Sequence, residues 1–146
     1  MILIIGGAYQ GKLDFAKEEF NIKEDEVLDV PKLCSMSFEK NDQDLNYAID
    51  GFMDQNSGFA KCIYGLDAYI KHLTERGISS DNWIKKLIET PSGLGIVIIS
   101  DVSQGLVPME FEDRVFREAN GRAMIMLAEH ATEVYRVFCG IGTRIK

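Results

Sequence analysis

A glycine-rich stretch directly after an apolar run is the first part of the chain whose residue types could bind a ligand. In MILIIGGAYQGKL, residues Gly6, Gly11 and Lys12 have the spacing of the phosphate-binding pattern G-x-x-x-x-G-K-[ST]. Glycines allow successive N–H groups to turn inward around an anion, and a lysine adds a point charge. A tight strand-to-helix turn is the alternative. We predict a nucleotide-phosphate site whose residues are Gly6, Gly7, Ala8, Tyr9, Gln10, Gly11, Lys12 and Leu13.

The last position of this pattern departs from the rule. Leu13 stands where a serine or threonine hydroxyl would bind Mg²⁺. Leucine cannot coordinate a metal, so Mg²⁺ would have to be held by the nucleotide, by water and by a carboxylate elsewhere. We expect the anion-binding function to persist without the usual protein contact to the metal, and we assign no residue as a metal ligand.

The elements that must position this loop alternate between strands and helices. Apolar runs predict strands over 2–5, 26–30, 95–100 and 133–139, and Pro31 is expected to stop the second of them. Helical spacing predicts helices from residue 11, over 44–54, over 59–76, from 80 or 81 to 89, and over 110–131. Residues 31–43 are expected to be irregular, and residues 140–142 to form a turn.

This alternation favours an α/β fold, with a parallel sheet between two layers of helices, in a single domain over residues 1–146. Ligands bind at the carboxyl ends of the strands in such sheets. The segments 6–12 and 100–108 both leave from that edge, so we expect them to lie together.

Composition and charge exclude several classes of protein. Sixteen basic and 23 acidic residues give a net charge of −7, and without a run of lysine or arginine this argues against extended nucleic-acid binding. No apolar run is long enough for a membrane span or a signal peptide, so we expect a cytoplasmic protein. The three cysteines, Cys34, Cys62 and Cys139, are widely spaced, which predicts reduced thiols rather than a zinc site.

The C-terminal third carries a second set of motifs. They are Ser100-Asp101-Val102, Gly105-Leu106-Val107-Pro108, Arg114, Phe116-Arg117-Glu118, Gly121-Arg122, Glu133-Val134 and the stretch from Gly140 to Lys146. In this order they resemble the bifunctional adenosylcobinamide kinase / adenosylcobinamide-phosphate guanylyltransferase family (CobU type). The alignment needs no gap from Ile96 to Lys146 and, with Ile2–Lys12, covers somewhat under half of the chain.

The resemblance implies a P-loop fold of the recombinase-like type, a homotrimer, and a role in cobalamin biosynthesis and salvage. The family phosphorylates the aminopropanol hydroxyl of a corrinoid, adenosylcobinamide, with ATP or GTP, and then adds GMP through a histidine. On this basis Lys12 would stabilise the transferred phosphoryl group, and Asp101 would serve Mg²⁺ or the substrate hydroxyl. Arg117 and Arg122 would contact substrate or phosphate. Charge pairing on the helix for the arginines, and loop capping for Asp101, are the alternatives.

The sequence departs from the family at positions that matter for chemistry. After the second predicted strand it reads PKLCSMSFEKNDQD, without the family's H-x-x-x-R-P, and neither His72 nor His130 is placed to carry GMP. Lys61 is the nearest counterpart of a metal-site acid, with Asp67 as a displaced candidate. Two hypotheses remain: a cobinamide kinase-like protein that has lost the guanylyl step, or a catalytically impaired paralogue that binds nucleotide or corrinoid as a regulatory or partner subunit. A trimeric domain that binds nothing is disfavoured by the intact loop.

Overall fold

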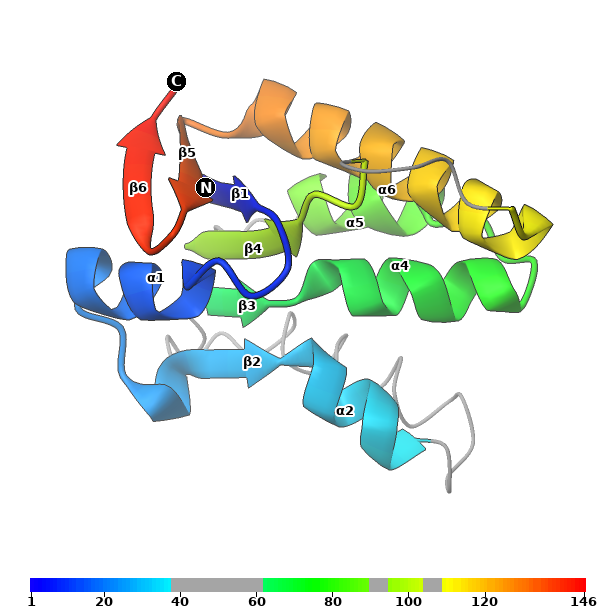
Figure 1. The fold of residues 1–146 in the computed structure, drawn as a ribbon, viewed down its shortest axis with the longest axis horizontal. Coiled ribbons are helices and arrows are strands. Elements are labelled where there is room, and N and C mark those ends of the chain that lie inside the picture. Colours follow the sequence, from blue (N-terminus) through cyan, green and yellow to red (C-terminus); the bar gives the residue numbers. More distant parts are fainter. Residues whose placement is uncertain (38–61, 90–94, 104–108) are drawn as a thin grey trace.

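A computed structural model describes residues 1–37, 62–89, 95–103 and 109–146. The described residues form a six-stranded sheet with helices on both faces (Figure 1). The strands are β1 (Ile2–Gly6), β2 (Val27–Asp29), β3 (Cys62–Tyr64), β4 (Ile96–Ser100), β5 (Glu133–Phe138) and β6 (Ile141–Arg144). The helices are α1 (Lys12–Phe20), α2 (Val30–Ser37), α4 (Leu66–Glu75), α5 (Asp81–Glu89) and α6 (Phe111–His130), with a 3-10 turn at Glu24–Glu26. None of these helices is long and apolar enough to cross a membrane.

The strands are ordered β2-β3-β4-β1-β5-β6. Each neighbouring pair from β2 to β5 is parallel, whereas β6 runs antiparallel to β5. In the centre, Leu3 of β1 pairs with Val97 of β4 on one side and with Val134 of β5 on the other. The predicted α/β class is therefore confirmed, and the sheet is parallel as predicted except at β6. The loop after β1 leaves from the middle of the sheet.

Alternating side chains of the central strands build two separate cores. Leu3, Val97 and Val134 pack with residues of α2, α4, α5 and α6 on one face. Ile4, Ile98 and Val137 pack with α1 on the other face. Figure 1 accordingly shows α6 and α1 on opposite sides of β1 and β4. Burial on both faces explains why β1 and β4 are continuous apolar runs rather than alternating ones.

The helix predicted over residues 59–76 is wrong in its first part. Within that range the structure places β3, paired with β2 and β4, and α4 begins only at Leu66. Gly65 separates the two with a φ of 74°, in the left-handed region. A strand of three residues is too short to show its own periodicity, so the helical spacing of α4 masked it.

Two further expectations are corrected. The strand predicted over 26–30 already ends at Asp29. The segment that follows is not irregular at its start, because α2 begins at Val30 and includes Pro31. Proline is compatible with the first turn of a helix, where its missing N–H has no intrahelical partner to lose. The tail after Gly140 is not only a turn, since it continues as β6. The predicted helix over 44–54 and the segment 105–108 lie outside the described residues.

The two glycines that flank α4 provide a test of the β3–α4 junction. Gly65 and Gly77 both have a left-handed φ, but a Cβ on Gly65 would lie 2.5 Å from Pro31, whereas a Cβ on Gly77 would meet nothing within 4 Å. Gly77→Ala should therefore lower the free energy of unfolding by about 1–2 kcal/mol, the cost of the backbone conformation. Gly65→Ala should lower it by more, because Pro31 must also move. Urea unfolding of both variants measures the difference, and equal losses would contradict this packing.

Candidate functional site

The segment between β1 and α1 forms the core of the site, and we call residues Gly6–Leu13 the phosphate loop. Tyr9 and Gly11 have φ angles of 57° and 76°, both in the left-handed region. This backbone turns the chain sharply, so that α1 begins at Lys12 with the N–H groups of its first turn facing the loop. A Cβ on Gly6 would lie 2.4 Å from the carbonyl oxygen of Val137, which explains why glycine is needed there.

Lys12 is the buried cation of this loop. Its side chain is only 6% exposed, and its Nζ donates a hydrogen bond of 2.6 Å to the carbonyl oxygen of Gly7. Burial lowers the pKa of Lys12, and the nearby Asp67 carboxylate partly opposes that shift by raising it. The ammonium group is therefore held across the loop by the neutral Gly7 carbonyl. A phosphate oxygen can take the place of this carbonyl and form a stronger hydrogen bond, because it is charged.

The β5–β6 turn holds the phosphate loop from the other side. Gln10 accepts a hydrogen bond from the Cys139 N–H through its side-chain Oε1 (2.7 Å) and another from the Gly140 N–H through its carbonyl (2.9 Å). The place for a Cβ on Gly11 is 3.2 Å from the Cα of Gly140. This contact joins residues far apart in the sequence, and the glycine at 140 is the one local sign of it. The loop and the hairpin are thus one connected unit.

The end of β4 places Asp101 beside the loop. The Asp101 N–H donates to the Gly6 carbonyl at 2.9 Å, and its Oδ1 accepts hydrogen bonds from both the N–H and the hydroxyl of Ser103. The predicted neighbourhood of Asp101 and the phosphate loop is therefore present. Through its hydrogen bonds with Ser103, the Asp101 carboxylate caps its own loop, as expected if it does not serve Mg²⁺ or the substrate hydroxyl.

Two helices hold the residue before Asp101. The Ser100 N–H donates to Asp67 Oδ1 of α4, and the Ser100 carbonyl accepts from the side-chain amide of Asn120 of α6, both at 2.9 Å. Asn120 is completely buried. Asp67 thus accepts a hydrogen bond from the end of β4 and also interacts electrostatically with Lys12. These contacts differ from the role of a displaced metal-site acid that the sequence suggested for it.

Two hollows adjoin the phosphate loop, and Gln10 lines both of them. The first, of about 320 Å³, is lined by the five residues from Tyr9 to Leu13 together with Asp14 and Tyr64. The second, of about 200 Å³, is lined by Ile5, Gly6, Gly7, Gln10, Asp101, Arg136, Val137 and Phe138. The first hollow presents Lys12 and the amino end of α1, which suits an anion. The second presents a carboxylate and an arginine next to the same loop.

The two arginines predicted from the resemblance lie outside these hollows. Arg117 donates to the carbonyl of Ser103, so it supports the segment that carries Asp101. Arg122 contacts the carboxylate of Asp81 on α5 at 3.4 Å. Arg136 of β5 lines the second hollow instead. The alternating pattern of β5 could have indicated the position of Arg136, because Arg136 is two residues from the buried Val134 and lies on the same side of the strand as Phe138.

The side chains around the loop do not fit the usual magnesium site. Leu13 lines the first hollow at the position of the missing hydroxyl. No group of three metal-ligating side chains occurs in the described ranges of the chain. The histidines lie elsewhere: His72 is buried beside Arg76 on α4, and His130 contacts the Met126 carbonyl near the end of α6. All three cysteines are free thiols.

The comparison with protein families identifies a relationship for the second half of the chain. The family model described as cobinamide kinase / cobinamide phosphate guanyltransferase matches residues 66–145, from the start of α4 almost to the C-terminus. The match includes Asp67, Asp101, Asn120 and Arg136, and it begins after the phosphate loop. The search of curated proteins returned no match.

The lowered pKa of Lys12 predicts a pH effect on stability. The unfolded chain binds this proton with the ordinary pKa of 10.5, whereas the folded chain binds it less tightly. The folded state should therefore gain stability as pH rises from the lowered pKa to 10.5, relative to Lys12→Met, which carries no charge at any pH. Urea unfolding across this window measures the gain.

Lys17 on the same helix provides the control for this measurement. Its pKa is raised, first by its hydrogen bond with Glu24. Wild type should therefore show no such gain relative to Lys17→Met in the same pH window, because the unfolded chain releases the Lys17 proton before the folded chain does, so that stability falls rather than rises as pH approaches 10.5. A flat difference between wild type and Lys12→Met would show that Lys12 is not buried as a charged group.

Proposed function

Because the chain belongs to the cobinamide kinase / cobinamide phosphate guanyltransferase family, a family of P-loop NTPases, we propose that it is a nucleotide-binding phosphotransferase for a corrinoid. ATP or GTP would bind through Gly6–Leu13, and the acceptor would be a corrinoid hydroxyl. The observation that carries the proposal is the buried Lys12, held on the Gly7 carbonyl at the mouth of a glycine loop between β1 and α1. The recombinase-like subtype, a homotrimer and a cytoplasmic location belong to the same proposal, the first supported by the strand order.

The two hollows suggest how the reacting groups are arranged. The terminal phosphates of the nucleotide would occupy the hollow of Lys12, where the lysine and the backbone N–H groups stabilise their charge. The acceptor hydroxyl would enter the hollow of Asp101. Its oxygen would bond to the γ-phosphorus while the bond to the β–γ bridging oxygen breaks, the nucleoside diphosphate leaves, and the hydroxyl proton passes to the Asp101 carboxylate.

Mg²⁺ has a reduced role in this proposal. Leu13 supplies no ligand, so the metal would be held by phosphate oxygens and water, with at most a nearby carboxylate such as Asp14 or Asp101. The chain's own contribution is the orientation of the phosphates by the loop and the position of Asp101 beside Gly6.

The impaired paralogue, a regulatory or partner subunit, is the second candidate, and Leu13 favours it. Such a protein would keep the phosphate loop for binding and would not transfer the phosphoryl group. The two candidates differ in turnover and in their response to Mg²⁺, so one set of titrations and assays separates them.

Calorimetric titration with ATP and with GTP tests the nucleotide site. Lys12→Ala should reduce affinity by at least about tenfold, because a charged hydrogen bond to phosphate is lost.

Leu13→Thr should strengthen binding in Mg²⁺ relative to binding without it, because it restores the missing ligand. Phosphoryl transfer to cobinamide by the wild type would favour the kinase. Tight binding without turnover and without a response to Mg²⁺ would favour the paralogue, and absence of nucleotide binding would exclude both the kinase and a nucleotide-binding paralogue.

The absence of the H-x-x-x-R-P segment predicts that no covalent GMP intermediate forms. His72 is buried against Arg76, and His130 lies at the far end of α6, so neither faces the hollows. Incubation with GTP labelled at the α-phosphate, followed by denaturation at alkaline pH, should leave the chain unlabelled. Label that disappears in His72→Asn or His130→Asn would overturn this prediction and restore the guanylyl step.

A further inference from the structure

We propose that the face of the β5–β6 hairpin formed by Arg136, Phe138, Ile141, Thr143 and Ile145 binds the corrin ring of the acceptor, and we call this surface the hairpin face. The inference rests on the proposed function and locates its acceptor. It names a site outside the phosphate loop, with a ligand that combines a large apolar ring and peripheral amides.

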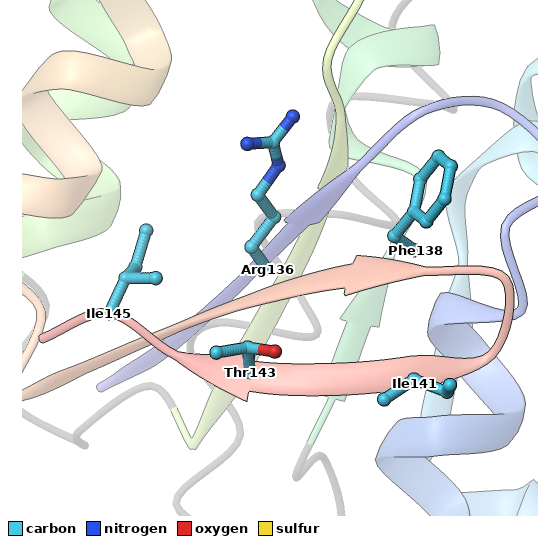
Figure 2. A pocket seen from close by; sticks show the side chains of 5 residues that line it. All are labelled: Arg136, Phe138, Ile141, Thr143 and Ile145. Atoms are coloured by element: carbon cyan, nitrogen blue, oxygen red, sulfur yellow. The ribbon is translucent and has the colours of Figure 1, made fainter.

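The hairpin face is a hollow of about 580 Å³ with an apolar lining. Phe138, Ile141 and Ile145 are 67%, 72% and 58% exposed, an unusual concentration of large apolar side chains on one short hairpin. The antiparallel register pairs Phe138 with Ile141 and Arg136 with Thr143, so each pair shares one side of the hairpin. Figure 2 shows Arg136, Phe138 and Ile145 rising from the same side.

This hollow adjoins the candidate acceptor site. Arg136 and Phe138 line both the hairpin face and the smaller hollow that contains Asp101, Gly6 and Gly7. A ligand lying on the hairpin face can therefore extend an arm past these two side chains to the phosphate loop. The hydrogen bonds from Cys139 and Gly140 to Gln10 fix the hairpin relative to that loop.

The chemistry of the lining matches a corrinoid better than the nucleotide's base. A base with its ribose must stay close to its own phosphates, whereas the hairpin face extends along two strands to Ile145, away from the loop. The acceptor instead consists of a broad ring with a hydroxyl arm. Its ring can cover the three apolar side chains, and the carbonyl groups of its peripheral amides can accept hydrogen bonds from Arg136 and Thr143.

The test uses dicyanocobinamide, whose visible absorbance reports binding, and GTP in a separate calorimetric titration. The variant is Phe138→Ala/Ile141→Ala, and the matched control is Ile125→Ala on α6, whose side chain is comparably exposed. Because these side chains are exposed, the variants should fold. We expect cobinamide affinity to fall by at least about tenfold in the hairpin variant, with GTP affinity changed less than about twofold and the control unchanged. Arg136→Met should weaken cobinamide binding to a smaller extent.

Other outcomes overturn the inference in recognisable ways. Loss of GTP affinity with retained cobinamide affinity would place the nucleotide on the hairpin face. Unchanged affinity for both would leave the proposed function standing and remove the hairpin face from it. A wild type that binds GTP but no cobinamide would refute the corrinoid acceptor itself. A drop in sedimentation mass of the hairpin variant, with cobinamide binding unchanged, would assign the surface to a second copy of the chain.

Discussion

The attachment of the phosphate loop to the end of β5 is the constraint on which the rest of the site depends. Gly6 leaves β1 so close to the Val137 carbonyl that no side chain fits between them, and Gln10 then accepts hydrogen bonds from the hairpin turn through both its backbone and its side chain. This arrangement fixes the direction in which α1 starts, and therefore the burial of Lys12. It also brings Arg136 and Phe138 next to the loop, although they are more than 120 residues away in sequence.

The elements that the sequence predicted well are those buried on both faces of the sheet. β1 and β4 are continuous apolar runs, because side chains pointing to either face meet a helix or a neighbouring apolar cluster. The missed elements owe their structure to partners elsewhere in the chain. β3 has three residues and becomes a strand through pairing with β2 and β4, and β6 depends on its antiparallel pairing with β5. Such long-range pairing leaves little trace in a local pattern.

The residues of the candidate site also fall into two groups, those that the sequence could predict and those that it could not. The residues of the phosphate loop follow one another in sequence, so their spacing alone predicted that they lie together. Arg122 shared a helix with Arg117 and followed a family motif, yet its side chain turns to Asp81 of α5. Arg136 and Asp67 carry no motif, and their relation to the loop arises only when the sheet forms. The sequence thus indicated the candidate anion site but not the surfaces that surround it.

Ser100 joins three elements in a way that affects the mechanical behaviour of the site. Its N–H is bound by α4 through Asp67 and its carbonyl by α6 through the completely buried Asn120. A rotation of α6 about its axis would withdraw the Asn120 amide from the Ser100 carbonyl, while Asp67 would still hold the Ser100 N–H. The orientation of this 20-residue helix therefore contributes, through one hydrogen bond, to the position of the strand end. Asp101 is therefore linked to α6 through Ser100 and Asn120, and this link is separate from its hydrogen bond to Gly6 in the phosphate loop.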